Sequence, residues 1–124
     1  MLSVEDHPVF KRRGPDLFVE VPLRLDEAAL GTELTVPTLD GTTRIRVPAG
    51  TPSGKVFRLA GRGMKQAKGR PGDLHIKVHV ETPRGLTPDQ RSAVASLAKA
   101  LHTESYPDRA RFDATVSQRA DRDS

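Results

Sequence analysis

The 124-residue sequence contains no cysteine and no tryptophan, and it has only one tyrosine and four phenylalanines. The absence of cysteine excludes disulfide bonds, zinc sites with cysteine ligands and cysteine nucleophiles. The scarcity of aromatic residues, with a hydrophobic content of 35%, allows only a modest core. A domain of this size buries roughly two-thirds of its unfolded surface. We therefore expect association with a second copy or a larger chain to contribute to stability.

Long apolar runs are also absent. No segment approaches the roughly 18 to 20 consecutive apolar residues that a membrane-spanning helix requires. The N-terminal segment lacks the apolar core of a secretory signal peptide. The sequence therefore predicts a soluble, cytoplasmic protein without a membrane partner.

The motifs of phosphate-binding enzymes are incomplete. Gly54 and Lys55 resemble part of a phosphate-binding loop, which also requires glycine at position 49 and serine or threonine at position 56. The chain has Ala49 and Val56 at these positions. The glycine-rich segment is therefore interpreted as a turn, a strand and a second turn rather than as a phosphate site.

Other catalytic arrangements are missing as well. His75 and His79 lie four residues apart in a strand-like segment, which predicts a separation of about 13 Å on one face. Because the ligands of one metal ion lie ~2 Å from it, these histidines cannot share an ion, and we expect both to face solvent. No acidic cluster suggests general acid–base catalysis. We expect no enzymatic activity, no metal site and no cofactor.

What the sequence does contain is typical of an all-β chain. Ten prolines and ten glycines stand mostly between short runs of alternating apolar and polar residues. In the clearest run, residues 72–83, Leu74, Ile76, Val78 and Val80 alternate with polar residues. Strands are expected within residues 16–25, 32–39, 42–48, 55–61 and 72–83. The predicted fold is mainly β: a small β-sandwich-like domain with one short helix, then an amphipathic helix and a disordered tail.

Turn residues separate these runs. Asp26 is placed to cap a one-turn helix over residues 26–31, and Gly31 is placed to end it. The dipeptide Asp40-Gly41 favours a type I′ hairpin turn. Positive φ angles are expected at further glycines where strands reverse. These are Gly54, Gly61, Gly63, Gly69 and Gly72.

Three of the predicted strands contain or end in Val-Pro. Proline cannot donate a hydrogen bond to a neighbouring strand, so each proline marks an edge, a bulge or a strand end. The three dipeptides are Val21-Pro22, Val36-Pro37 and Val47-Pro48. Several edges in one small domain imply that some backbone is available to a visiting strand.

The character of the sequence changes at residue 85. Thr87 is placed to cap a helix, with Pro88 in its first turn and Gln90 completing a capping box. An apolar stripe with helical spacing follows: Val94, Leu97, Ala98 and Leu101. Beyond Tyr106 the chain is polar with balanced charges, and a disordered tail is expected.

The net charge of +4 is concentrated in one stretch. Six basic residues and no acidic residue stand between positions 55 and 70. A solvated face beside glycine-rich turns is favoured over an anion-binding surface.

In five blocks the chain resembles the C-terminal substrate-binding region of DnaJ-type co-chaperones (J-domain proteins). Together these blocks cover about 80 residues: 7–23, 27–41, 47–64, 72–83 and 85–101. In that family this region is the second of two stacked β-domains, followed by a dimerisation helix. The resemblance implies binding of unfolded polypeptide, homodimerisation and delivery of clients to the seventy-kilodalton heat-shock chaperone.

Other parts of that family's pattern are not found in these 124 residues. His7-Pro8 is followed by Val9 rather than by the aspartate of the J-domain signature. The Gly/Phe-rich linker and the four C-x-x-C-x-G-x-G zinc motifs are also missing, so we expect a fragment or a truncated relative. The predicted domains are 1–6, a remnant of a preceding β-domain; 7–83, the β-domain; 84–103, the dimerisation helix; and 104–124, the tail.

Two sets of site residues follow as hypotheses. The dimer contact is assigned to the apolar stripe of the terminal helix, comprising Leu86, Val94, Leu97, Ala98 and Leu101. Client contacts are assigned to apolar residues beside the Val-Pro strand ends, namely Val21, Leu23, Leu34 and Val36, with a plain core role as the favoured alternative.

Two rival functions stay open. A nucleic-acid-binding module would use the basic stretch 55–70, but apart from Phe57 no aromatic residue there could stack on a base. A purely structural dimerisation module would rest on the capped terminal helix alone, and it would ignore unfolded peptide.

Overall fold

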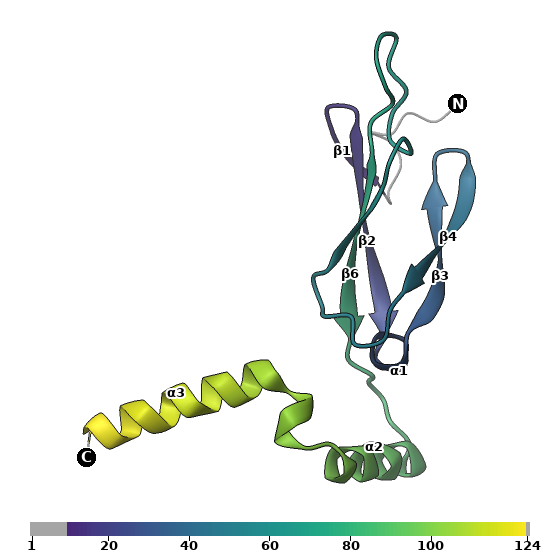
Figure 1. Ribbon diagram of the computed structural model, residues 1–124. Coiled ribbons are helices and arrows are strands. Elements are labelled where there is room, and N and C mark those ends of the chain that lie inside the picture. The colour runs from purple at the N-terminus through teal and green to yellow at the C-terminus, as the bar shows by residue number, and fades with distance from the viewer. Residues whose placement is uncertain (1–9, 124) are drawn as a thin grey trace. The chain divides into compact units, whose positions relative to one another are not determined.

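The computed structural model describes residues 10–123, so the remnant of a preceding β-domain expected at residues 1–6 lies outside the described residues. The chain divides after Pro83 into two compact units. The first contains every strand of the described chain, and the second contains helices α2 and α3 (Figure 1). Among residues 10–123, no helix has the length and hydrophobicity needed to cross a bilayer.

The larger sheet of the first unit has four strands. Its order is β1 (Phe10–Arg13), β2 (Asp16–Arg24), β6 (Leu74–Glu81) and β5 (Val56–Leu59). β1 and β2 are antiparallel, as are β5 and β6, whereas β2 and β6 run parallel from Leu17↔Leu74 to Arg24↔Glu81. The pairing with β1 ends at Phe10↔Val19, so the second half of β2, which contains Pro22, pairs with β6 alone within the described chain.

The smaller sheet is a hairpin of β3 (Thr32–Thr38) and β4 (Gly41–Val47). The short helix α1 (Leu25–Leu30) links β2 to this hairpin. Gly31 ends α1 with a φ of 86°, as its sequence position predicts. The predicted cap is wrong: the helix starts after Arg24, whose N–H donates to the Glu27 carboxylate at 3.0 Å, and Asp26 lies inside the first turn.

The hairpin between β3 and β4 forms where the sequence predicts it, but its turn differs. The register pairs Thr38 with Gly41, which puts Leu39 and Asp40 in the turn. No non-glycine residue of the described chain has a positive φ. A type I′ turn needs positive φ at both central residues, so the predicted turn type is wrong.

One core joins the two sheets and confirms the mainly β fold. Inward-facing residues from β1, β2, β3, β4, β6 and α1 form a single buried cluster. The most buried of them are Leu17, Val19, Leu23, Val36, Val47, Leu74, Ile76 and Val78. The alternation that the sequence showed in each run puts these residues on the inner faces, since successive side chains of a strand point to opposite sides.

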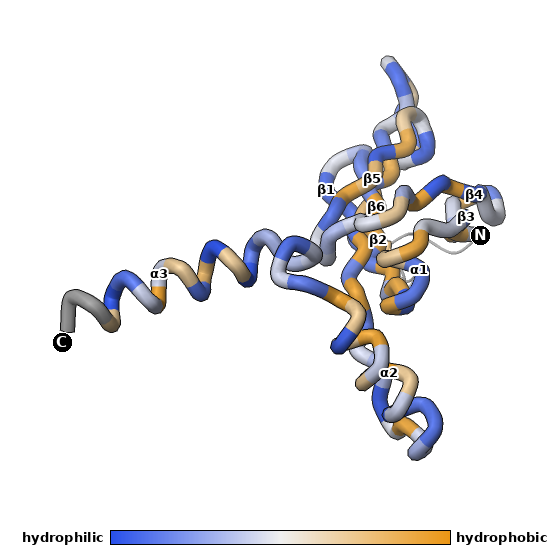
Figure 2. Tube along the Cα trace, turned by 60° about the horizontal axis from the view of Figure 1, so that its bottom comes forward, coloured by the Kyte–Doolittle hydropathy of each residue, from blue (hydrophilic) through white to orange (hydrophobic). Residues whose placement is uncertain are grey.

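The second unit begins with α2 (Pro88–Ala100). Its predicted capping box is confirmed: the Gln90 N–H donates to Thr87 Oγ1 at 3.2 Å, and the Thr87 N–H donates to Gln90 Oε1 at 2.8 Å. A 3₁₀ helix, η2 (Thr103–Ser105), and a long helix, α3 (Pro107–Asp123), follow. Figure 2 shows hydrophilic colours over much of α3, with separate apolar positions among them.

Helix α3 differs from the disordered tail that the composition predicts. Its charges are spaced for pairing along a helix: Arg109 Nε lies 3.0 Å from Asp113 Oδ1, and Arg111 pairs with Asp108 one turn earlier. Opposite charges three or four residues apart stabilise a helix by about 0.2–0.5 kcal/mol each. Balanced charge was interpreted as a sign of disorder, whereas the spacing of the charges favours a helix.

Candidate binding surface on the outer face of the sheet

The four residues expected to contact a client lie at different depths. Leu23 and Val36 have no exposed surface and belong to the core. A client could reach neither side chain without unfolding the domain, so both are removed from the candidate site. Val21 and Leu34 are only partly buried and pack against the core from its margin.

The stripe assigned to the dimer contact lies on the second unit. α2 contains no buried residue, and Val94 and Leu97 expose 41% and 47% of their surface. Ala98 is exposed, while Leu86 and Leu101 are half-buried. The stripe is therefore accessible in this single copy, and its role in dimerisation stays a prediction.

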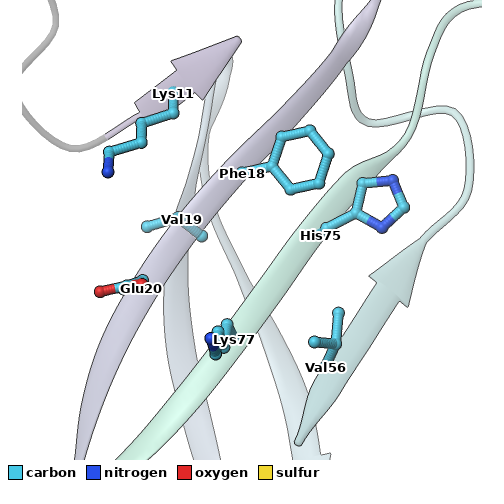
Figure 3. Close-up of a pocket in the computed structure, with 7 residues that line it drawn as sticks. All are labelled: Lys11, Phe18, Val19, Glu20, Val56, His75 and Lys77. Atoms are coloured by element: carbon cyan, nitrogen blue, oxygen red, sulfur yellow. The ribbon is translucent and has the colours of Figure 1, made fainter. Parts of the chain in front are cut away.

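The outer face of the four-stranded sheet carries a groove that the sequence alone did not indicate. Figure 3 shows the side chains that line it on four neighbouring strands. The groove has a volume of about 510 Å³, within the range of ligand sites in proteins. Its lining comprises Lys11, Phe18, Val19, Glu20, Val56, His75 and Lys77.

An aromatic pair forms the centre of this groove. The register pairs Phe18 with His75, and their rings stack with centroids 4.6 Å apart and an angle of 11° between the planes. The Arg13 guanidinium lies over the Phe18 ring, 5.9 Å from its centroid. Both histidines lie on the outer face of the strand, as expected, but His75 is partly buried against Phe18, whereas His79 is exposed.

Beside the aromatic pair lies a polar network that joins the ends of β2 and β6. The Asp73 N–H donates to Asp16 Oδ1 at 2.8 Å, and His75 Nε2 lies 3.2 Å from Asp16 Oδ2. The Asp73 carboxylate accepts from Arg58 Nε at 2.6 Å and from the Gly61 N–H at 3.1 Å. The sequence does not indicate this acidic pair, because these residues meet only through the parallel pairing of β2 with β6.

The network lowers two pKa values. The pKa of Asp16 lies below the ordinary value of 3.8. The main cause is the hydrogen bond that Asp16 accepts from the Asp73 N–H, and the second is its hydrogen bond with His75. The pKa of Asp73 is lowered as well, mainly by the hydrogen bond from the Gly61 N–H and further by the one from the Arg58 guanidinium. In each case the hydrogen bonds stabilise the ionised carboxylate.

Three side chains of this network could each offer one ligand atom to a metal ion, and these atoms lie within 4.8 Å of one another: Asp16, Asp73 and His75. The Asp73 carboxylate, however, already forms an ion pair with Arg58. A bound cation would have to displace this guanidinium or lie against its positive charge. The donor set therefore fits an ion-pair network better than a metal centre.

The groove opens onto the edge strand β5. Its first residue, Val56, exposes 47% of its surface, and no strand of the described chain pairs with the outer edge of β5. The inner edge is held by β6, and the preceding loop continues the pairing: the Gly54 N–H donates to the Val78 carbonyl at 2.7 Å. An extended chain could therefore pair with β5 without disturbing the sheet.

The loop between β5 and β6 carries most of the basic stretch. Its base lies against the β1–β2 turn, and two glycines allow this close approach. The Met64 N–H donates to the Pro15 carbonyl at 2.7 Å, and the Gly63 N–H donates to the Gly72 carbonyl at 2.8 Å. A Cβ added to Gly63 would lie 2.6 Å from the Pro15 oxygen, and one added to Gly72 would overlap the Pro15 carbonyl. Neither glycine has a positive φ, in contrast to the prediction, whereas Gly54, Gly61 and Gly69 do.

The family of this chain follows from its similarity to known proteins. Residues 1–83 match the family model of the DnaJ C terminal domain. The chain belongs to this family. The match to the DnaJ C terminal domain ends at Pro83, where the first compact unit also ends.

Curated relatives carry the name Chaperone protein DnaJ. The protein from Methylorubrum populi is 44% identical over 117 residues, which cover 93% of this chain and 30% of the relative. The one from Opitutus terrae is 43% identical over 108 residues, 86% of this chain and 28% of the relative. The one from Xylella fastidiosa strain M12 is 52% identical over 91 residues, 73% and 25% respectively. This chain spans about 30% or less of the length of these relatives.

Proposed function

We propose that this DnaJ C-terminal domain acts as a chaperone or co-chaperone module. It binds extended segments of unfolded polypeptide in the groove on the outer face of the sheet. It pairs with a second copy through the apolar stripe of α2. Delivery of clients to the seventy-kilodalton heat-shock chaperone is proposed for the full-length context of the relatives, because it depends on regions that these 124 residues do not contain.

The observation that carries the proposal is the position of the groove beside an unpaired strand edge in a domain of this family. Phe18 and Val56 provide apolar contact area within the groove. The outer edge of β5 provides hydrogen-bonding groups of the backbone. An unfolded chain presents the same two features, exposed apolar side chains and unpaired backbone, so the surface and the client are complementary.

Pairing through the backbone explains how one surface could accept many clients. When a peptide adds to a sheet edge, the main-chain hydrogen bonds contribute affinity regardless of sequence, and the side-chain pockets add preference. A shallow groove on an edge is expected to bind each segment weakly. Two copies joined by α2 would offer two such grooves to one client chain.

The proposal is tested by titrating an extended peptide rich in Leu and Phe into the protein and recording amide chemical shifts at two salt concentrations. Shifts are expected on β5 and on the outer face of β2 and β6, with little change in affinity between the two salts. A Val56→Asp variant should weaken binding, because it puts a charge at an apolar part of the groove. Val116→Asp on α3, at a position that is 49% exposed, is the matched control.

Each rival predicts a different result. No shifts from a chain that remains dimeric would show a purely structural dimerisation module. Binding that needs low salt and no apolar residue would show a polyanion site, such as one for nucleic acid, because phosphate contacts weaken steeply with salt. Shifts confined to Val21 and Leu34 would move the client site to the margin of the core.

A further inference from the structure

We propose that the groove prefers client segments in which an acidic residue flanks an apolar side chain. This inference rests on the proposed function, because it names the class of segment that the same groove would select. It follows from the charges that surround the apolar floor in Figure 3.

Cations outnumber anions along the groove. Lys11 and Lys77 line it from β1 and β6, and Arg13 lies over the ring of Phe18. The one carboxylate among the lining residues is Glu20, which is paired with Lys77 in the strand register. Three cations therefore face one carboxylate, and an occupant with negative charge is favoured.

The nearest further carboxylates do not cancel this excess. Asp73 is engaged by the Arg58 guanidinium at 2.6 Å. Asp16 accepts from the Asp73 N–H at 2.8 Å and lies 3.2 Å from His75 Nε2. Even when the charge of Asp16 is counted, three cations face two carboxylates at the groove. Lys11 and Lys77 are both exposed, so their ammonium groups can reach a carboxylate on a bound segment.

The floor of the groove is where the apolar side chain would lie. The stacked rings of Phe18 and His75 present a flat surface, and Val56 borders it on β5. An apolar group that covers these rings leaves its neighbours in the client chain near the lysines. An apolar floor beside lysines distinguishes the groove from the basic β5–β6 loop. There Lys65 and Lys68 are exposed on a segment that does not line the groove.

The test uses three labelled peptides with the same Leu/Phe core and with Glu, Gln or Lys at the flanking positions. Fluorescence anisotropy with the full chain at low salt should give affinities in the order Glu, Gln, Lys. The Glu peptide is expected to bind about five-fold more tightly than the Gln peptide, since exposed charge pairs are individually weak. Polyglutamate without apolar residues should bind much more weakly than the Glu peptide.

Charge reversal locates the preference. The double variant Lys11→Glu, Lys77→Glu should invert the order of the three peptides, because the groove would then favour basic flanks. The matched control Lys65→Glu, Lys68→Glu makes the same charge change on the loop and should keep the original order. An amide spectrum that matches the wild type outside the altered strands shows that both variants are folded.

The outcomes separate this inference from the function on which it rests. If none of the peptides binds, the proposed function itself fails at this groove. If all three bind with equal affinity, client binding stands and the acidic preference is overturned. The preference is also overturned if polyglutamate binds as tightly as the Glu peptide, or if the order survives reversal of Lys11 and Lys77.

Discussion

At the scale of single residues, Gly63 and Gly72 are explained by space rather than by backbone conformation. Both lie where the β5–β6 loop meets the carbonyl of Pro15, at distances that leave no room for a Cβ. A positive φ was expected at both because glycine most often stands in turns for that reason. A close approach between two backbones cannot be recognised until the partner, here the β1–β2 turn, is known.

Gly72→Ala is expected to destabilise the domain, because its methyl group would overlap the Pro15 carbonyl and force the loop away from the turn. Overpacking of this kind costs about 1–3 kcal/mol. Urea unfolding of the variant should show this loss in the free energy of unfolding. Ala67→Val is the control from the same loop, because it adds methyl groups at an exposed position and should leave the free energy of unfolding nearly unchanged. Equal losses in the two variants would contradict the role assigned to Gly72.

Asp16 and Asp73 make the stability of the domain depend on acidity. Both carboxyl groups have a pKa below the ordinary value in the folded state. A lowered pKa stabilises the folded state above the unfolded pKa of about 3.9, and this contribution is lost as the pH falls through the folded value. The free energy of unfolding should therefore decrease on acidification below about pH 4.

The test compares unfolding of the wild type with Asp16→Asn and Asp73→Asn from neutral to acidic pH. Asparagine keeps an acceptor oxygen but cannot ionise, so each variant should be less stable at neutral pH and should change less on acidification. Asp40→Asn, in the turn between β3 and β4, is the control for loss of a carboxylate. A dependence on pH that is unchanged in all three variants would place its origin elsewhere.

At the scale of elements, the strands and α2 could be predicted from the sequence, whereas their partners could not. Alternation indicated Leu74, Ile76 and Val78 as inward residues because burial on one face of a strand imposes a period of two. The capping box of α2 was evident because its two hydrogen bonds join residues three positions apart. The groove depends on Phe18 meeting His75 across parallel strands, and a local pattern carries no information about such a partner.

The exposed stripe of α2 is the element to which we assign the proposed dimer contact. Leu97→Asp is expected to convert a dimer into monomers, because it puts a carboxylate at the centre of the apolar face. Sedimentation equilibrium measures this directly. Ser92→Asp introduces the same group on the side of the helix opposite the stripe, at an exposed position, and should leave the dimer intact. If both variants remain dimeric, the interface lies elsewhere in the chain.

At the scale of the whole molecule, the second unit would matter, in the proposed dimer, through the number of binding sites that it brings together. Linking two weak sites converts the second binding event into an intramolecular one. Overall affinity can then exceed that of one site by a factor of about 10² to 10⁴ when the linker lets both sites bind at once. A small domain with a shallow groove would thereby retain long unfolded chains better than short segments.

A peptide that carries two binding segments should therefore bind the dimer far more tightly than a peptide with one segment. The gain should depend on linker length and should disappear in Leu97→Asp, whereas that variant should bind the single-segment peptide as the wild type does. Anisotropy with a series of linkers measures both effects. Loss of binding to the single-segment peptide in Leu97→Asp would show instead that α2 belongs to the client site.

The parallel pairing of β2 with β6 also constrains how the domain is made. It joins segments 57 positions apart, as in the bond between Asp16 and the Asp73 N–H. During synthesis β2 must wait for β6 to emerge before the sheet can close, and the backbone edge of β2 that pairs with β6 stays unpaired until then. Contacts between such distant segments slow folding relative to local ones. A domain that is proposed to protect unfolded chains would itself depend on protection early in its own synthesis.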